Sequence, residues 1–168
     1  AGTLLRIEGP LGQFWLRSES PRPALMVGGG TGYAPLRAML RQLIAAGDRR
    51  PVTMYWGAVE PSGLYEHDWL ERLARERAGF RYCPVLSGAP SADAQWSGRR
   101  GLVHEAVLAD LADLAGFDVY ASGPPGLIEA IRTGFVERGL PREQLFFDSF
   151  DYAPDTLAKL AGSGATAV

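Results

Sequence analysis

A glycine-rich junction between an apolar segment and a helix-like segment constrains this chain more than any other feature. Residues 24–27 are apolar (ALMV), residues 28–35 read GGGTGYAP, and residues 36–46 carry apolar side chains at helical spacing. A strand that turns through glycines into a helix directs unpaired backbone N–H groups and the positive end of the helix dipole to one point. The junction therefore predicts a strand–turn–helix unit that is suited to bind a phosphate group.

The spacing within the junction is G-x-G-x-x-P, with Pro35 where the common dinucleotide motif has its third glycine. Proline fits a first helical turn, because its missing N–H would have no partner within the helix. The glycines admit close approach of a ligand, and Thr31 can either bind the phosphate through its hydroxyl or cap the helix. An ordinary glycine-rich turn without a ligand is the alternative that this segment alone leaves open.

Length and composition predict one domain. The 168 residues, of which 46% are hydrophobic, are enough to bury a sizeable core. The net charge is −2 and the 17 basic residues are scattered, which argues against nucleic-acid binding. No apolar segment approaches the roughly 20 residues that span a membrane, and the first residues do not read as a signal peptide. We therefore expect a soluble, cytoplasmic protein without a membrane partner.

A single cysteine, Cys83, excludes both an internal disulfide and a four-thiolate iron–sulfur site built from this chain. It lies in the apolar segment 80–86, where we expect a buried structural thiol. The two histidines, His67 and His104, are too isolated in the sequence to suggest a metal site, so we predict none.

Short apolar segments alternate with amphipathic ones along the chain, which is typical of βαβ units. The predicted strands cover residues 25–28, 52–56, 80–86, 118–121 and 144–147. Helical spacing of apolar residues predicts four intervening helices, around residues 36–44, 69–73, 103–111 and 127–135. We therefore predict an α/β fold with a doubly wound, five-stranded parallel sheet of the Rossmann type.

The two ends of the chain do not follow this pattern. Residues 3–17 predict two short strands around a glycine–proline turn, and we interpret residues 1–17 as the remnant of a preceding domain. Residues 18–23 are predicted to form a linker, and residues 24–152 the α/β domain. Residues 153–168 are predicted to be disordered.

Ligands of an open parallel sheet bind beyond the carboxyl ends of its strands, where the winding direction reverses. The loops 28–35, 57–64, 87–98 and 122–126 should therefore meet at one edge. Glu60 is placed to bind a ribose hydroxyl, although a solvated loop glutamate explains it equally well. Ser122 opens a second strand–turn–helix junction, SGPPG, with prolines at the predicted helix entry.

Seven elements of the sequence occur in the order in which a known family has them. They are residues 9–14 (GPLGQF), 29–35 (GGTGYAP), 55–58 (YWGA) with 64–65 (LY), 84–87 (PVLS), 96–99 (WSGR), 119–125 (VYASGPP) and 146–150 (FFDSF). In these elements the chain resembles, from residue 4 to residue 152, the pyridine-nucleotide domain of the ferredoxin–NADP reductase superfamily. The chain is most similar to the reductases of iron–sulfur oxygenases and to deoxysugar (CDP-glucoseen) reductases.

The resemblance implies that NAD(P)H binds this domain and passes hydride to an FAD held by a neighbouring β-barrel, which then supplies electrons to an iron–sulfur domain or protein. It implies that Gly30, Thr31 and Gly32 hold the pyrophosphate, that residues 122–125 border the nicotinamide, and that Asp148 and Phe150 lie beside the reacting rings. The residues predicted to act in catalysis are Ser122, Asp148 and Phe150. The residues predicted to bind the cofactor are Gly29, Gly30, Thr31, Gly32, Tyr33, Pro35, Gly57, Glu60, Ser87, Arg99, Gly123, Pro124 and Pro125.

Three departures from the family pattern refine this expectation. Ser122 stands where members usually have cysteine, so hydride transfer is expected to be slower. Gly88 stands where NADP-specific members have arginine, and together with Glu60 it favours NADH, although Arg99 or Arg100 could bind a 2′-phosphate. The chain also lacks the family's flavin-binding motif, so we expect the FAD on an adjacent domain outside it.

Two alternatives to an electron-transfer component stay open. One is a reductase of free flavin, and the other is a nucleotide-binding module without catalytic activity.

Overall fold

A six-stranded parallel sheet organises the part of the chain that the computed structural model describes, which is residues 2, 4, 6, 12–88, 96 and 98–150. The strand order is β4-β3-β2-β1-β5-β6, and every neighbouring pair is parallel. The strands are β1 (Ala24–Gly29), β2 (Val52–Ala58), β3 (Phe80–Leu86), β4 (Arg99–Arg100), β5 (Asp118–Gly123) and β6 (Leu145–Ser149). The helices are α1 (Tyr33–Ala45), α2 (His67–Glu76), α3 (Val103–Asp110) and α4 (Pro125–Glu137), with the short 3-10 helices η1 (Gly30–Gly32), η2 (Pro61–Gly63) and η4 (Arg142–Gln144).

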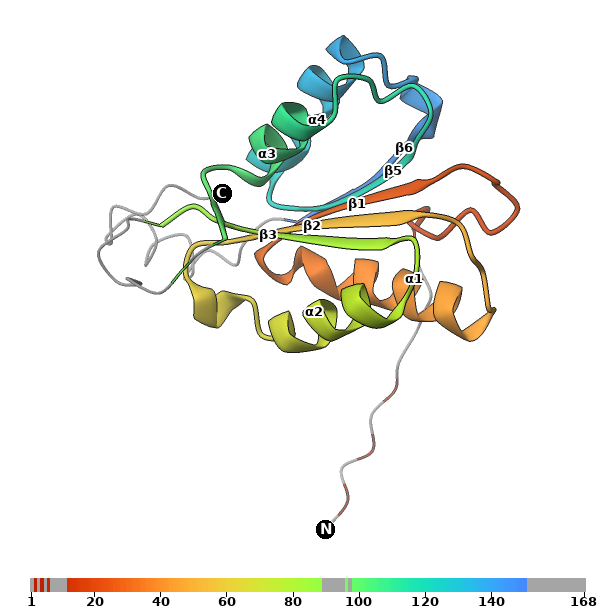
Figure 1. Cartoon of the computed structure of the whole chain (residues 1–168), viewed down its shortest axis with the longest axis vertical. Coiled ribbons are helices and arrows are strands. Elements are labelled where there is room, and N and C mark those ends of the chain that lie inside the picture. Colours follow the sequence, from red (N-terminus) through yellow and green to blue (C-terminus); the bar gives the residue numbers. More distant parts are fainter. Residues whose placement is uncertain are drawn as a thin grey trace.

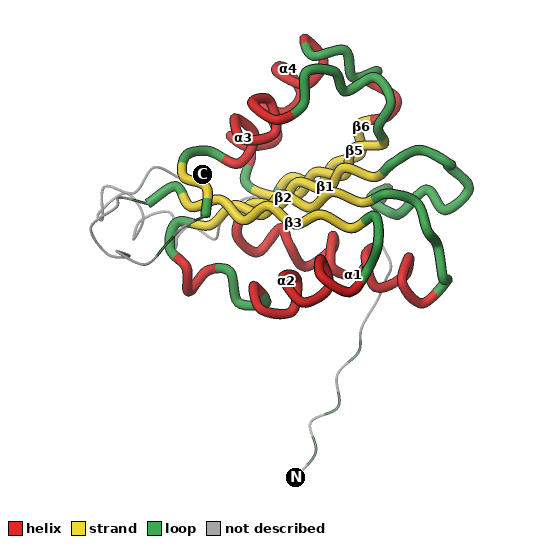
Figure 2. Tube along the Cα trace, viewed as in Figure 1, coloured by secondary structure: helices red, strands yellow, loops and turns green. Residues whose placement is uncertain are grey.

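The sheet lies between two layers of helices. Helices α1 and α2 cover one face, and α3 and α4 cover the other (Figure 1; Figure 2). Successive side chains of a strand point to opposite faces, so each strand contributes to both cores. On β1, Met26 packs with the core beneath α1 and α2, whereas Leu25 and Val27 pack with the core beneath α3 and α4. All six residues of β1 are buried, which explains why its sequence is continuously apolar.

The predicted doubly wound parallel sheet is confirmed, with one strand more than expected. The additional strand is β4, two residues at the edge of the sheet, too short to be recognised from its sequence. The predicted β3 has the observed bounds, whereas β1, β2, β5 and β6 extend one or two residues further toward their carboxyl ends. These extensions consist mainly of glycine, alanine and serine, which have low strand propensity and are held in the sheet by their neighbours.

The winding direction reverses between β1 and β5. Helix α1 leaves β1 on one face of the sheet, and α4 leaves β5 on the other (Figure 1). The two strands are adjacent, with Gly28 opposite Ser122. The turns that follow β1 and β5 therefore diverge from a common point, and open parallel sheets bind their ligands at such points.

The ends of the chain are only partly described. No strand occurs in residues 12–23, so the second of the two short strands predicted for residues 3–17 is not observed. Leu16 is nevertheless buried in the core, because side-chain contacts rather than a strand ladder hold this segment. Most of the first predicted strand, the predicted disordered tail 153–168, and residues 89–95 and 97 of the long loop lie outside the described residues. No helix in the described part of the chain is long and apolar enough to cross a membrane.

Candidate functional site

The turns that follow β1 and β5 pack against each other through glycines. A Cβ atom on Gly32 would lie 2.1 Å from the carbonyl oxygen of Ser122, and a Cβ on Gly29 would lie 2.7 Å from a methyl carbon of Leu127. Gly30 has a φ of 53°, in the left-handed region that favours glycine. The glycines thus allow the two turns to meet at the reversal point.

This packing gives the glycines a structural role, while their predicted contact with the cofactor stays a prediction. Gly29, Gly32 and Gly123 are buried, and the space beside each of them is filled by the facing turn. Of the first junction, Thr31 and Ala34 are exposed and Gly30 and Pro35 are half-buried, so these four residues form its accessible surface. The backbone and hydroxyl around Thr31 are therefore accessible, while the buried glycines support the turn from within.

The helices that start at this point have N-termini suited to an anion. Neither α1 nor α4 has a side-chain cap or an acidic residue in its first turn. In contrast, the first turns of α2 and α3 contain Asp68 and Glu105. The helix dipole favours negative charge at both N-termini. In α4, Pro124 and Pro125 have no N–H. The Leu127 N–H donates to the Pro124 carbonyl, so Gly126 supplies the backbone donor of this turn. The two N-termini beside the β1–β5 crevice are thus the favourable places for a phosphate among the four α-helices.

The three residues predicted to act in catalysis come together at the ends of β5 and β6. Ser122 and Asp148 are opposite each other in the sheet, and the backbone N–H of Phe150 donates to the carbonyl of Gly123 over 3.3 Å. Asp148 is exposed, whereas Ser122 is fully buried. The Oγ atom of Ser122 has no hydrogen-bond partner. Leaving a buried hydroxyl unpaired costs about 1–3 kcal/mol, so Ser122 has a hydrogen-bonding capacity that the described residues do not use.

Trp56, at the end of β2, supports the glycine junction from the side. Its indole N–H donates to the carbonyl of Gly30 over 2.9 Å. The ring of Tyr33 stacks on it with a centroid distance of 3.9 Å, and Tyr65 packs edge-on at 5.0 Å. Sequence reasoning did not identify Trp56 as a supporting residue, because its contact with Gly30 depends on the alignment of β1 and β2. The parallel register that places Trp56 opposite Gly28 was the signal that could have revealed it.

Tyr33 was predicted to bind the cofactor, but its side chain belongs to the core. It is fully buried, and its hydroxyl donates to Glu66 over 2.7 Å. Burial and this hydrogen bond raise the pKa of Tyr33, so the phenol stays protonated. Burial opposes ionisation of Glu66, but the hydrogen bonds from Arg37 and Tyr33 outweigh it and lower the pKa of this carboxyl. The sequence could not distinguish these two placements, because an aromatic residue at a helix entry can face either the ligand or the core.

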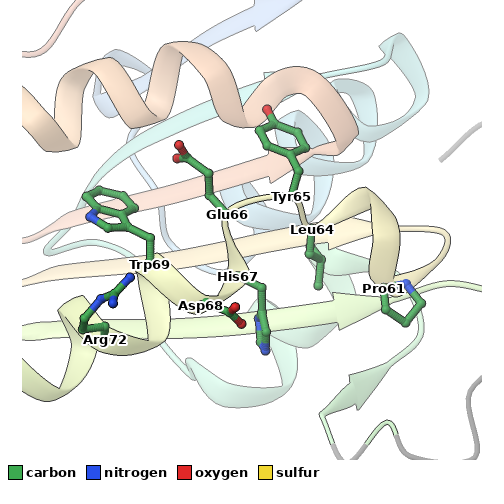
Figure 3. Close-up of a pocket in the computed structure, with 8 residues that line it drawn as sticks. All are labelled: Pro61, Leu64, Tyr65, Glu66, His67, Asp68, Trp69 and Arg72. Atoms are coloured by element: carbon green, nitrogen blue, oxygen red, sulfur yellow. The ribbon is translucent and has the colours of Figure 1, made fainter.

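A hollow of about 420 Å³ lies at the start of α2, beside the contacts among Tyr33, Arg37 and Glu66 (Figure 3). Tyr65 and Glu66 point toward α1, while His67 points the opposite way (Figure 3). The hollow is lined by Pro61, Leu64, Tyr65, Glu66, His67, Asp68, Trp69 and Arg72.

The loops after β2 and β3 are linked to each other. The backbone N–H of Ser87 donates to the carbonyl of Ala58 over 2.9 Å, which brings the predicted residues Ser87 and Glu60 to neighbouring loops. Glu60 is exposed. Gly57, in contrast, is buried, and a Cβ there would lie 2.9 Å from Val103. Gly57 thus packs against α3, and its predicted contact with the cofactor stays a prediction.

Arg99 was predicted to contact the cofactor, and the structure turns its side chain toward α3. Its guanidinium donates to the carbonyl of Ala106 and forms an ion pair with Asp110. Arg100 donates to the carbonyl of Gly88 over 3.3 Å. Arg99 would thus have to break its ion pair with Asp110 before its guanidinium could bind a phosphate.

The remaining predicted residues are distributed around the same edge. Pro35 is half-buried in the first turn of α1, Pro124 is buried, and Pro125 is exposed at the start of α4. Cys83 is a free, half-buried thiol, and burial raises its pKa. The described residues include no group of three or more His, Cys, Asp or Glu side chains that could hold a metal ion.

Several known proteins are similar to this chain. The model of the oxidoreductase NAD-binding domain matches residues 26–133. The chain is 42% identical over 151 residues to the CDP-6-deoxy-L-threo-D-glycero-4-hexulose-3-dehydrase reductase of Yersinia pestis, which covers 88% of this chain and 43% of that protein. It is 37% identical over 154 residues to a probable flavin reductase of Vibrio harveyi, which covers 90% of this chain and 64% of that protein.

Among solved structures, the Amycolatopsis cytochrome P450 reductase GcoB superposes with a TM-score of 0.76 at 32% identity. The aligned part covers 84% of this chain and 42% of the reductase. The chain thus spans 43% and 64% of the two curated relatives and a similar share of this structure.

Proposed function

The chain belongs to the oxidoreductase NAD-binding domain family, and from this premise we propose that it holds NADH for hydride transfer to an FAD bound on a neighbouring domain. The single observation that carries the proposal is the meeting of two uncapped helix N-termini at the reversal point between β1 and β5. A pyrophosphate is the part of NADH that such a point suits best.

The residues of the site fit two parts of this cofactor, the pyrophosphate and the nicotinamide. Thr31 and the backbone around it bind the pyrophosphate, and the unpartnered hydroxyl of Ser122 hydrogen-bonds the nicotinamide carboxamide. Because that hydroxyl is fully buried, binding includes a local rearrangement at the end of β5. When bound, NADH supplies the hydride and is oxidised to NAD⁺, and the FAD is reduced. The protein contributes orientation and exclusion of water, since the redox chemistry belongs to the cofactors.

We infer a preference for NADH over NADPH from the charges of the β2 and β3 loops. The exposed Glu60 would face the adenosine ribose, where a carboxylate binds a hydroxyl and repels a 2′-phosphate. Arg99, one of the two candidate partners for that phosphate, is paired with Asp110. The 2′-phosphate of NADPH would therefore lie near the carboxylate of Glu60, and the guanidinium of Arg99 is already paired with Asp110.

A titration with NADH and NADPH tests the site, with tryptophan fluorescence as the signal because Trp56 contacts Gly30. Thr31→Val is the informative variant, because Thr31 is exposed and its change does not disturb the packed glycines. We expect it to weaken NADH binding about tenfold, as the loss of a hydrogen bond to a charged group predicts. Thr133→Val, on an exposed position of α4, is the matched control and should bind like the wild type.

The titration has two results that oppose the proposal. Absence of binding by either nucleotide would exclude the site. Equal affinity for the two nucleotides would contradict the preference for NADH. Gly32→Val, in contrast, is a poor test, because its side chain would collide with the Ser122 carbonyl and disturb the fold itself.

The similarity to a probable flavin reductase supports free flavin as a second candidate acceptor. The similarity to a cytochrome P450 reductase instead supports an electron-transfer component that delivers electrons to a further protein, such as an iron–sulfur partner. Steady-state oxidation of NADH with free FMN or FAD distinguishes them. Saturation at micromolar free flavin would favour the flavin reductase, whereas reduction of a tightly bound FAD alone would favour the electron-transfer component. NADH binding without reduction of either flavin would favour a module that has no catalytic activity.

A further inference from the structure

Residues 15–18, which we name the strap, are fixed to the sheet by contacts that the nucleotide site does not use. Leu16 is 5% exposed and belongs to the core beneath α1 and α2. The backbone N–H of Arg17 donates to the hydroxyl of Tyr120 over 3.0 Å. A segment without secondary structure is therefore held as firmly as an element of the fold.

Two aromatic rings contact the side chain of Arg17. Its guanidinium carbon lies 4.3 Å from the ring centroid of Trp15 and 4.4 Å from that of Phe146. The Phe146 ring in turn stacks on Tyr120, with a centroid distance of 5.2 Å. Cation–π contacts of this kind stabilise by about 0.5–1 kcal/mol at exposed sites and more when desolvated. The stack joins the strap to both β5 and β6.

Arg50 binds the backbone of the strap through hydrogen bonds to its carbonyl oxygens. Its guanidinium is largely buried and donates to the carbonyls of Arg17 and Ser18 over 3.0 and 2.6 Å. The same side chain donates to Asp48 over 2.8 Å, and this contact lowers the pKa of the Asp48 carboxyl. The planar fork of arginine is suited to hold several acceptors at once, and a lysine in its place could not.

The strap rests on the same two strands that carry the proposed nicotinamide site. Tyr120 is opposite Phe146 in the sheet, and two residues further along the same strands Ser122 is opposite Asp148. Two residues of a strand span about 6.6 Å. The position of the strap is therefore fixed relative to the reactive edge.

We propose that the strap is an interdomain clamp, in which Arg17 and Arg50 are positioning residues that orient a flavin-binding domain attached upstream toward the carboxyl ends of β5 and β6. The inference rests on the proposed function. Two relatives of the chain are longer than the part it matches, which leaves room for such a domain. Hydride transfer depends steeply on the distance and angle between the two rings, and a misplacement of about 1 Å can reduce the rate on the order of a hundredfold.

The test uses the complete, flavin-loaded protein and the variants Arg17→Ala and Arg50→Lys. We expect the rate of flavin reduction by NADH, followed anaerobically by stopped-flow absorbance, to fall tenfold or more. The dissociation constant of NADH should stay within twofold of the wild type, because neither arginine contacts the nucleotide site. In Arg50→Lys, trypsin should also cleave the bond between Arg17 and Ser18 faster than in the wild type. Arg49→Ala, at the exposed neighbouring position, is the matched control and should change none of these quantities.

Each outcome bears on the inference. A wild-type rate of flavin reduction in both variants would overturn the clamp while leaving the proposed function intact. A loss of NADH binding together with a lower melting temperature would overturn it as well, since the strap would then be a structural support only. A wild-type protein that binds no NADH or reduces no bound flavin would overturn the proposed function, and the clamp with it.

Discussion

At the scale of single residues, Ser122 combines two properties that rarely occur together in a structural residue. Its side chain is fully buried, and its hydroxyl has no hydrogen-bond partner. Such a hydroxyl destabilises the free protein, because burial removes its water without replacing it.

We therefore predict that Ser122→Ala leaves the free energy of unfolding unchanged or raises it by about 1 kcal/mol. The same change should weaken NADH binding about two- to tenfold, because the carboxamide loses its hydrogen bond. Urea denaturation and NADH titration measure the two effects. A less stable variant with unchanged NADH affinity would show that the hydroxyl serves the fold. Ser122→Cys is the matched comparison, and in the flavin-loaded protein it should transfer hydride at least as fast as the wild type.

The glycines show how far residue-level reasoning from the sequence extends. The G-x-G-x-x-P spacing correctly located a strand–turn–helix unit at the reversal point of the sheet. The spacing could not reveal what lies beside each glycine, since that depends on a turn about ninety residues away in the sequence. Position 32 has to be glycine because a Cβ there would collide with the carbonyl oxygen of Ser122, which belongs to the second strand–turn–helix junction.

At the scale of elements, the strands and helices were predictable because their apolar periodicity is strong and their connections are short. The ends of the strands were predicted less well, because Gly29 and Gly123 have low strand propensity and are held by neighbouring strands. The contacts that hold the strap were not predicted either. Its anchors are side chains of β5, β6 and Arg50, which are distant in sequence and leave no periodic signal.

The contact between α1 and the start of α2 gives a test at this scale. Tyr33→Phe removes the hydrogen bond to Glu66 and keeps the stack on Trp56. A hydrogen bond to a charged group stabilises by about 1.5–3 kcal/mol, so we expect a loss of that order in urea denaturation. NADH affinity should stay within twofold of the wild type. Weaker binding at unchanged stability would instead return Tyr33 to the cofactor site. Tyr65→Phe, on the exposed ring beside it, is the control and should have little effect on stability.

The same variant has a defined pH dependence. The pKa of Glu66 in the folded protein lies below its ordinary value of 4.5, so the stability that its charge contributes is present above that value. This contribution is lost as the pH falls through the folded pKa. The difference in stability between wild type and Tyr33→Phe should therefore be constant between pH 6 and 8 and become smaller below pH 4.5, as the pH falls through the folded pKa of Glu66. A difference that does not change with pH would show that the carboxylate is not its source.

At the scale of the whole molecule, one sheet connects both cores to the nucleotide site. Strand β1 pairs with β2 and β5, and the cores on the two faces share these strands. Unfolding of either core would break the sheet that supports the other, so we expect a single cooperative transition. A ligand that binds between β1 and β5 should then stabilise the entire domain rather than one loop.

This coupling makes thermal stability a measure of cofactor choice. A ligand present at a hundred times its dissociation constant stabilises the native state by about 2.7 kcal/mol. For a domain of this size that corresponds to an increase in melting temperature of roughly 5–10 °C. We predict an increase of this order with NADH and a smaller one with NADPH at the same concentration, because Glu60 repels the 2′-phosphate. Glu60→Gln should reduce the difference between the two cofactors, whereas Glu76→Gln, at the far end of α2, should not. If both cofactors raise the melting temperature equally in the wild type, Glu60 does not face the ribose, and cofactor selection must come from another part of the molecule.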